Sequence, residues 1–231
     1  MSRPNVNISV VTSPATEKST EGAASDTPDD DGKTYHHGDL PSALRAATAE
    51  LITEKGPTGF SLREVARRAG VSHSAPAHHF GDSKGLLTSV AAEGYATLVA
   101  AFEEAKAIPD VIERLNSMGK AYVRTAVTKP GHFGVMCSRE LINHEDPEFF
   151  DLAERAFELL AETITEVAEK HNPKLNVDAA SIWVWSTVHG LASLQIGLEA
   201  LDEKSGTTGA DQLIDQYTDL MVHGLFKGTG N

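Results

Sequence analysis

Residues 61–79 read SLREVARRAGVSHSAPAHH, and this stretch is the most informative part of the sequence. Ser61 and Glu64 have the Ser-x-x-Glu spacing of a capping box, which predicts that a helix begins here. Apolar residues then recur at helical spacing, and Gly70 is placed to end the helix, because glycine readily adopts the left-handed conformation of a C-terminal cap. The first half of the stretch is therefore predicted to be a short amphipathic helix.

The second half of the stretch predicts a turn and another short helix. Gly70 and Val71 can form the turn, and Ser72 can cap a helix that runs to about His79. Two short helices that cross steeply need a small residue at the crossing, a glycine where the backbone reverses and an apolar residue in the turn. Ala66 supplies the small residue. The spacing therefore predicts a helix-turn-helix, an element that places its second helix in the major groove of DNA.

The helical pattern continues on both sides of this element. Apolar residues recur at spacings of three and four, glycine and proline separate the segments, and no segment shows the alternation of a strand. We expect an all-α protein of about nine helices. Beyond the pair just described, the expected helices are Leu40 to the Gly56-Pro57 break, Asp82 to about Phe102, Asp110–Val127, Gly131–Leu141, Pro147 to about His171, Val177–Leu201 and Asp211–Phe226.

Composition places the chain among globular proteins. It has 231 residues, 40% of them hydrophobic, and one cysteine, Cys137, which cannot form an internal disulfide. This cysteine usage fits a reducing compartment, so a cytoplasmic location is expected. Residues 1–34 are rich in Ser, Thr, Pro, Asp and Gly, and we expect them to form a disordered acidic tail.

The formal net charge of −13 argues at first against an anionic partner such as DNA. The charge is unevenly distributed, however. Residues 33–86, which contain the helix-turn-helix, carry a net charge of +2, whereas residues 87–231 carry −11. The acidity therefore lies outside the predicted DNA-binding part and is compatible with it.

Two regions resemble the TetR family of transcriptional regulators. The first contains His37-Gly38-Asp39-Leu40, the stretch from Ser61 to Ser72, the pair His79-Phe80 and the segment from Asp82 to Leu87. The second, Trp185 to Ala192, is similar to the signature of the WHG type of C-terminal domain. The resemblance implies a helix-turn-helix DNA-binding domain over residues 35–105 and a ligand-binding and dimerisation domain over residues 106–231. It also implies a homodimer that binds a palindromic operator on double-stranded DNA, usually as a repressor that a small-molecule effector releases.

The resemblance also assigns DNA contacts. Ser61 and Arg63 would meet phosphates or a base edge, His73 could donate to purine acceptors, and Ala75 could touch a thymine methyl group. Arg67 and Arg68 would add positive charge on the exposed side of their helix. The full set of expected DNA-binding residues is Ser61, Arg63, Ser72, His73, Ser74, Ala75, His78, His79 and Lys84. Two residues depart from the family pattern: Ala77 stands where a tyrosine is common and Ser83 where a lysine is common.

A pocket for the effector is expected in the C-terminal domain. Aromatic, sulfur-containing and histidine residues in its helices could line such a pocket, although residues of these types at helical spacing are also typical of an ordinary core. The candidate ligand-binding residues are Phe133, Met136, Cys137, Phe150, Phe157, Trp185 and His189.

The last two helices are expected to form the dimer interface. The stretch from Ala179 to Leu198 has no charged residue, and a helix that is apolar on most sides must be covered on most sides. An identical partner could cover it together with the last helix, although packing of both helices within one monomer remains an alternative. The apolar residues of the last helix are Leu213, Ile214, Tyr217, Leu220, Met221 and Leu225. The scattered polar residues of the stretch favour a buried helix over a membrane span.

Other classes of function have less support in the sequence. There is no Gly-x-Ser-x-Gly elbow, phosphate-binding loop, dinucleotide fingerprint, Cys-x-x-Cys or His-Glu-x-x-His, so we expect no enzymatic activity, no cofactor and no metal. The alternative is a helical ligand-binding or scaffold protein that has lost DNA binding, a hypothesis that Ala77 and Ser83 keep open.

Overall fold

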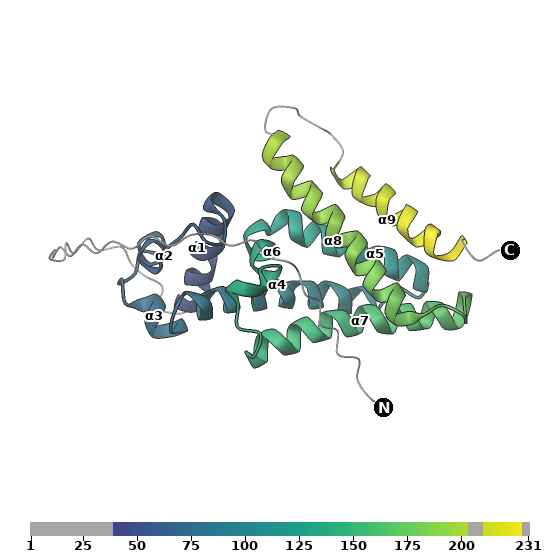
Figure 1. Ribbon diagram of the computed structural model, residues 1–231, viewed down its shortest axis with the longest axis horizontal. Helices are drawn as coiled ribbons and strands as arrows, with labels where there is room; N and C mark the ends of the chain where they lie inside the picture. The colour runs from purple at the N-terminus through teal and green to yellow at the C-terminus, as the bar shows by residue number, and fades with distance from the viewer. Residues whose placement is uncertain (1–38, 203–209, 228–231) are drawn as a thin grey trace. The chain divides into compact units, whose positions relative to one another are not determined.

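The structure of the protein is a computed structural model that describes residues 39–202 and 210–227. Over these residues it contains nine α-helices, one 3₁₀ turn and no strand, which confirms the predicted all-α fold (Figure 1). The predicted acidic tail, residues 1–34, lies outside the described residues. The helices are α1 (Leu40–Lys55), α2 (Leu62–Ala69), α3 (Ala75–Phe80), α4 (Ser83–Ala105), α5 (Val111–Thr128), α6 (Pro130–Met136), α7 (Pro147–His171), α8 (Val177–Asp202) and α9 (Ala210–Lys227), and the 3₁₀ turn is η1 (Arg139–Leu141).

Short polar side chains begin most of these helices. Asp39, Ser61, Asp82, Asp110 and Asp146 each accept a hydrogen bond from a backbone N–H in the first turn of the helix that follows, at donor–acceptor distances of 2.8–3.3 Å. Such caps satisfy N–H groups that have no partner within the helix. Because a cap involves residues only two or three positions apart, these helix starts could be predicted from the sequence.

The turn between α2 and α3 has the predicted form. Gly70 adopts a left-handed conformation at φ +69°, and its N–H donates to the Arg67 carbonyl at 3.2 Å. The next N–H, that of Val71, donates to the Ala66 carbonyl at 3.0 Å, which completes a Schellman cap. Ala66 is fully buried, as a residue at the crossing of two helices must be.

Two helices differ from their predicted bounds. The third begins at Ala75 rather than after Ser72, because the Ala75 N–H donates to the Ser72 carbonyl in a separate turn and helical bonding starts only at Ser74. The helix expected over 131–141 ends at Met136, and its last residues form η1. In both cases a tight turn takes residues that the apolar spacing assigned to a helix.

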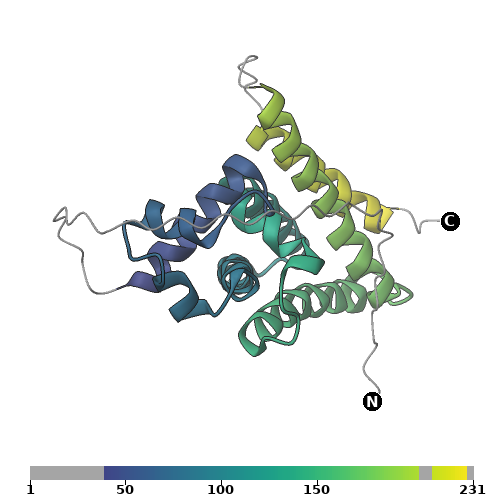
Figure 2. The ribbon, with the colours of Figure 1, turned by 60° about the vertical axis from the view of Figure 1, so that its left-hand side comes forward.

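Two hydrophobic clusters meet along α4. The smaller one is the core of the head, the part of the chain formed by α1–α3 and the start of α4, and contains Leu44, Ala47, Leu51, Val65 and Leu86. The larger one is the core of the body, formed by α4–α9, and takes in residues of α4 from Leu87 to Ala105. Figure 2, in which α4 is seen nearly end-on, shows α4 between α1 and α3 of the head and α6 and α7 of the body. One helix therefore carries residues of both cores.

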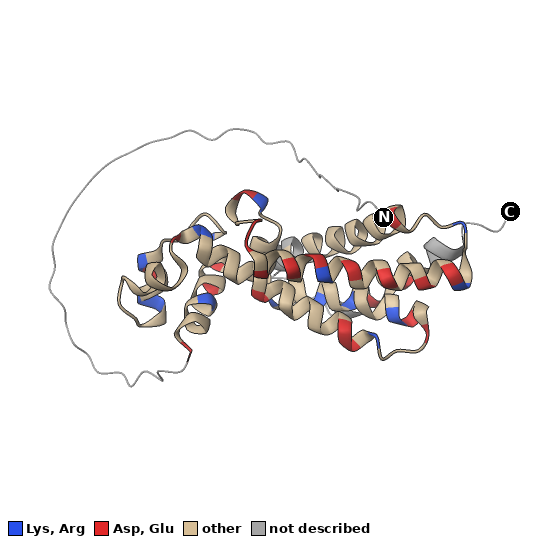
Figure 3. Ribbon diagram, turned by 90° about the horizontal axis from the view of Figure 1, so that it is seen from below, with Lys and Arg blue, Asp and Glu red and all other residues tan. Residues whose placement is uncertain are grey.

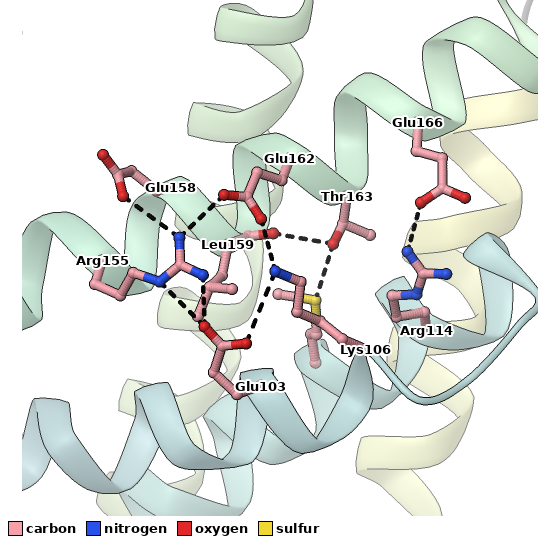
Figure 4. Close-up of polar contacts among 10 residues, drawn as sticks. Glu103, Lys106, Arg114, Arg155, Glu158, Leu159, Glu162, Thr163 and Glu166 are labelled. Atoms are coloured by element: carbon pink, nitrogen blue, oxygen red, sulfur yellow. Dashed lines mark hydrogen bonds and ion pairs between the residues drawn. The ribbon is translucent and has the colours of Figure 1, made fainter.

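Ion pairs fasten α4 and α5 to α7 outside the core (Figure 4). Arg155 of α7 donates to Glu103 of α4 at 3.1 Å and to Glu162 of its own helix at 3.0 Å, and Lys106, just after α4, binds Glu162 at 3.0 Å. The Lys106 ammonium and the Arg155 guanidinium hold the pKa of Glu162 below its usual value. A network of this kind stabilises the packing of the helices more than isolated exposed ion pairs do, since each isolated pair contributes little to the stability of the fold.

The last helix packs partly inside the monomer. Ile214 and Met221, which were expected at the dimer interface, are buried against the body core, whereas Leu220 is 71% exposed. Lys120 of α5 binds Asp215 of α9 at 3.2 Å, and Asn116 of α5 donates to Asp219. Leu213 and Leu225 have side chains outside the described ones. One side of α9 therefore packs within the monomer, whereas the side with Leu220 is exposed and could be covered by a partner subunit.

One described helix, α4, is long and apolar enough to pass the length and composition test for a membrane span, and half of the apolar window is buried within the protein. Its position between the head and body cores accounts for that apolarity, since both cores use its side chains.

Candidate functional site

The turn before α3 and the outer side of α3 form an exposed polar surface. Ser72, His73 and Ser74 are all exposed in the turn, and His78 and His79 are exposed near the end of the helix. The opposite side of α3 is anchored, since Ala75 is only 9% exposed and Pro76 is also buried. Pro76 occupies the second position of the helix, where a missing N–H costs no internal hydrogen bond. The turn and the helix thus present hydroxyls and imidazoles to solvent, while the buried side of the helix holds them in position.

Ala75 lies elsewhere than predicted. Because α3 starts at this residue, its methyl group faces the head and is buried there, so it cannot reach a thymine methyl group from the outer side. The exposed alanine of the helix is Ala77, at the position where the family commonly has a tyrosine.

The start of α2 and the start of α4 flank this surface. Ser61 and Arg63 are exposed at the first turn of α2, and Lys84 is exposed in the first turn of α4. The N-terminus of α4 has Asp82 as its cap, which accepts from the Gly85 N–H at 2.8 Å. Most of the predicted DNA-binding residues are therefore exposed at the head, at the start of α2, on α3 and its preceding turn, and in the first turn of α4.

Arg67 and Arg68 differ, although both were predicted to add positive charge on the exposed side of α2. The Arg67 side chain is 70% exposed, whereas that of Arg68 is 24% exposed and donates two hydrogen bonds to Glu54 of α1, at 2.6 and 2.7 Å. This paired geometry raises the pKa of Arg68 and lowers that of Glu54. Arg68 therefore fastens α2 to α1, whereas Arg67 lies 4.0 Å from Glu64 of its own helix and keeps most of its side chain exposed.

The body holds a second candidate site, the aromatic cluster of Tyr122, Phe133, Phe157, Trp185 and His189. The Tyr122 ring lies edge-on to those of Phe133 and Trp185, with centroids 6.0 and 5.2 Å apart, and Trp185 also contacts Phe157 at 6.0 Å. The His189 ring packs against Phe133 at 5.4 Å. The cluster therefore brings together four of the predicted ligand-binding residues, all of its members except Tyr122.

Hydrogen bonds at the cluster converge on one nitrogen. The Tyr122 hydroxyl lies 3.1 Å and the Cys137 sulfur 3.9 Å from Nδ1 of His189, so Cys137, a further predicted residue, touches the cluster. Burial lowers the pKa of His189, so its imidazole is neutral at pH 7. Cys137 has an exposed edge, but the atoms packed around its sulfur raise its pKa to about 12, which leaves an unreactive thiol.

An apolar pocket lies beside the cluster. It is lined by residues of α4, α5, α7 and α8, and its open space for a water-sized sphere is about 10 Å³, roughly room for one water. The lining residues are Phe102, Met118, Gly119, Tyr122, Leu160, Val184, Trp185 and Val188. No charged side chain is among them, and Tyr122 and Trp185 are shared with the cluster.

Other predicted ligand-binding residues lie elsewhere. Phe150 is 51% exposed near the start of α7, outside the cluster. Met136 is buried, and its sulfur fills the space beside Gly94 of α4. Tyr122 was missed, because its spacing within α5 only indicated a core position. The one available signal was that a buried tyrosine needs a hydrogen-bond partner.

A polar junction, Arg45–Glu93–His132, joins the head to the body and was also missed. Arg45 of α1 donates to Glu93 of α4 at 2.7 Å, and His132 of α6 places Nε2 3.7 Å from the same carboxylate. Nε2 of His132 is buried without a hydrogen-bond partner. Its burial lowers the pKa of His132 despite the nearby carboxylate, and Lys129 and Arg45 act in the same direction.

We expect stability to fall between pH 7 and pH 5. His132 and His189 have lowered pKa values in the folded protein, whereas an unfolded histidine titrates near 6.5. Below about pH 6.5 the unfolded chain therefore binds more protons than the folded one, and each pKa unit of difference costs about 1.4 kcal/mol. Urea unfolding at pH 7.5, 6.5 and 5.5 measures the effect.

A His132→Gln, His189→Gln double variant should flatten this pH dependence, since it removes both groups. His144→Gln is the matched control, because His144 is exposed. Equal pH dependence in the double variant and the parent would contradict the assignment. The carboxylates with lowered pKa values, such as Glu162, titrate below this range and do not interfere.

No cluster of three or more His, Cys, Asp or Glu side chains able to hold a metal occurs within residues 39–202 and 210–227. The adjacent histidines His78 and His79 have rings 5.4 Å apart at 77°, so they point in different directions.

Two family models match the chain. Residues 44–90 match the model described as bacterial regulatory proteins, tetR family, and residues 115–219 match the model described as tetracyclin repressor-like, C-terminal domain. The first covers most of the head and the second covers α5–α8 and the described start of α9. The first model therefore covers the part of the chain that contains the exposed surface of α3, and the second covers the part that contains the aromatic cluster.

Individual relatives agree with these matches. The chain is 30% identical over 87 residues to an HTH-type transcriptional repressor, Rv3405c, of Mycobacterium tuberculosis, a match that spans 37% of this chain and about half, 46%, of that relative. A Rhodococcus sp. RHA1 protein of unknown function is 27% identical, with a TM-score of 0.68 over 85% of this chain and 100% of that one.

A further solved structure shares the fold. The TetR family transcriptional regulator PfmR from Thermus thermophilus is 24% identical, with a TM-score of 0.63 over 82% of this chain and 96% of that one. The helix-turn-helix with its exposed α3, the two matching models and these relatives show that the chain belongs to the TetR family of transcriptional regulators.

Proposed function

We propose that the protein is a ligand-responsive repressor that binds a palindromic operator as a homodimer in the cytoplasm. Residues 35–105 form the DNA-binding domain, and residues 106–231 bind the effector and the partner subunit. The observation that carries the proposal is the exposed surface of α3 and its preceding turn, which offers hydroxyls and imidazoles from a helix whose other side is buried. Hydrogen-bonding side chains on a rigid helix suit base-edge recognition in the major groove.

The charge distribution supports one orientation on DNA. Arg63 and Lys84, which were predicted to contact DNA, and Arg67, which was predicted to add positive charge, lie on the head. Helix α7 of the body has seven acidic and two basic residues (Figure 3). The phosphate backbone attracts the first surface and repels the second. The protein therefore approaches DNA through the head despite its net charge of −13.

Binding to the DNA just upstream of its own gene tests the proposal. Fluorescence anisotropy at 50 and 200 mM salt should show specific binding that weakens steeply with salt, because phosphate contacts release counterions. The head has only modest net charge, and Ala77 and Ser83 lack the groups that family members often use for phosphate. Absent or salt-insensitive binding would favour a helical ligand-binding protein without DNA-binding activity.

The dimer is proposed to form through α8 and α9. Ile182, Trp183 and Leu194 of α8 are 39%, 44% and 65% exposed, and Leu220 of α9 is 71% exposed. Small residues such as Gly190, beside which a Cβ would meet no atom within 4 Å, lie between them on α8. Exposed large apolar side chains gathered on adjacent helices are typical of a protein interface, and a second copy can cover them by two-fold symmetry.

A Trp183→Glu, Leu194→Glu double variant is expected to be monomeric at concentrations where the parent is a dimer. A buried interface tryptophan typically contributes about 2 kcal/mol or more, roughly thirtyfold in the dimer dissociation constant. Analytical ultracentrifugation measures the change. Phe150→Glu is the control, because Phe150 is equally exposed but lies on α7. A double variant as dimeric as this control would place the interface elsewhere.

A further inference from the structure

The aromatic cluster and the pocket beside it form a chain of contacting side chains, here called the path, that runs from the surface to the interior of the body. Cys137 has an exposed edge and lies 3.9 Å from His189. The His189 and Tyr122 rings come next, and Tyr122 and Trp185 then line the apolar pocket. The polar atoms are thus at the outer end of the path and the purely apolar surface is at the inner end.

Two groups contact the same nitrogen of His189. The Tyr122 hydroxyl and the Cys137 thiol both lie against Nδ1, and we assign them as its donors. The pKa of each of these groups is raised by burial, so both keep their protons and can donate. A neutral imidazole whose Nδ1 accepts carries its proton on Nε2. Within the described residues this Nε2 has no hydrogen-bond partner, and it is left as a donor.

The pocket at the inner end of the path determines the polarity and charge of the rest of the ligand. Phe102, Met118 and Leu160 line the pocket, and no charged side chain does. The ion pairs of this region, such as Arg155–Glu103 and Arg114–Glu166, lie on the outside between α7 and its neighbours (Figure 4). The groups that contact His189, the Tyr122 hydroxyl and the Cys137 thiol, are uncharged as well, so a charged ligand group beside His189 would lose water without gaining a counter-ion from them.

From this arrangement we propose that the effector is an uncharged molecule with an apolar chain and a carbonyl oxygen. The chain occupies the pocket beyond Trp185, and the carbonyl oxygen accepts a hydrogen bond from Nε2 of His189. This inference rests on the proposed function, because it names the ligand class of the effector site.

The pocket must widen to admit the chain. Its present space is that of about one water, and Trp185 stands between the cluster and the pocket lining. Since the pocket lies between α8 and the helices α4, α5 and α7, widening displaces α8 from these three helices or moves α4. Either movement reaches the dimer surface or the helix shared with the head, which is where a change of DNA affinity must begin.

Three ten-carbon probes test the ligand class on the full chain without DNA: 2-decanone, decanoate and decylamine. They share a chain of similar length and differ in head-group charge. Isothermal titration calorimetry at pH 7.5 should show binding of 2-decanone at least tenfold tighter than either charged probe. Tighter binding of decanoate or decylamine, or no binding of any of the three, overturns the proposal.

Variants of His189 test the hydrogen bond. His189→Leu should weaken 2-decanone binding about threefold to tenfold, whereas His189→Gln, which can place an amide donor near the position of Nε2, should stay within about twofold of the parent. His171→Leu, on the exposed end of α7, is the matched control. If both His189 variants bind like the parent, or if Gln fails to rescue a folded Leu variant, the assignment of His189 is wrong.

The design separates this inference from the proposed function. Circular dichroism confirms that each variant is folded, and the Gln variant provides a result even if the Leu variant does not fold. Ligand binding is measured without DNA, so the two tests are independent. If the three probes do not rank as expected, the anisotropy measurement on upstream DNA still tests the proposed function. If the protein does not bind DNA, the ranking of the probes still tests the ligand class.

Discussion

Replacing Arg63 and His73 together by alanine is expected to weaken operator binding by roughly a hundredfold or more. In the proposed complex His73 donates to a purine acceptor and Arg63 contacts a phosphate, and a dimer makes each contact twice. A lost base contact costs about 1–3 kcal/mol per half-site, so the His73 change alone gives about 2–6 kcal/mol over a palindrome. Fluorescence anisotropy with the upstream DNA measures the loss.

The salt dependence distinguishes the two residues. Arg63 is the phosphate contact, so an Arg63→Ala variant should reduce the slope of log K against log salt by about 2, one for each half-site. His73→Ala should leave the slope unchanged, because His73 is assigned to a base edge and not to a phosphate. A slope that responds to His73 and not to Arg63 would show that these roles are exchanged.

A matched variant on the body is the control for charge. His171→Ala with Lys174→Ala also removes one histidine and one cation, but from the exposed end of α7 and the turn that follows it. It should bind the operator as the parent does or slightly more weakly, because it makes the body more acidic without touching the head. Equal losses in the two double variants would mean that only net charge matters.

Much of the fold could be predicted because it is determined locally. The caps at Asp39, Ser61, Asp82, Asp110 and Asp146 involve neighbours two or three positions away, and the left-handed Gly70 is a property of one residue. The two wrong helix bounds also have a local cause, because a tight turn competes with the helix for the same backbone groups. The turn over Ser72 to Ala75 and the 3₁₀ turn after Met136 use backbone hydrogen bonds that apolar spacing does not reveal.

The sites were less predictable because they depend on contacts across long stretches of chain. Arg67 and Arg68 are adjacent and chemically identical, yet only Arg68 meets Glu54, because α1 and α2 cross at that point. Tyr122 and His189 are 67 positions apart, and Arg45 and Glu93 are 48 apart. To predict these pairs one must know where the helices cross, and the apolar periodicity of each single helix does not give that information.

Gly131 is the residue whose role was least visible in the sequence, and Gly131→Ala is expected to destabilise the protein by about 1–3 kcal/mol. A Cβ built on Gly131 would lie 2.1 Å from the Ala49 carbonyl oxygen and 2.9 Å from the Thr53 hydroxyl of α1. A backbone oxygen within a helix cannot move aside alone, so α1 and α6 must separate. The urea midpoint should fall accordingly.

Gly134 of the same helix provides the control. Its Cβ would meet only Ile52 Cγ2, at 3.8 Å, which is an ordinary contact. Gly134→Ala should therefore keep or raise the urea midpoint, since alanine favours a helix by up to about 1 kcal/mol over glycine. Equal midpoints for the two alanine variants would show that α1 and α6 can separate at little cost.

The same pair of variants tests how the head is held to the body. The Gly131 contact joins α6 to α1, and the Arg45–Glu93–His132 junction connects the same two helices through Glu93 of α4. Helix α1 also holds α2 through Arg68 and Glu54. Separation of α1 from α6 therefore shifts the base on which α3 stands, and the spacing of two recognition helices in a dimer must match about 34 Å. We expect Gly131→Ala to weaken operator binding even at temperatures where it is fully folded, and Gly134→Ala to leave it unchanged. A folded Gly131→Ala protein with parental DNA affinity would mean that the head is positioned through α4 alone.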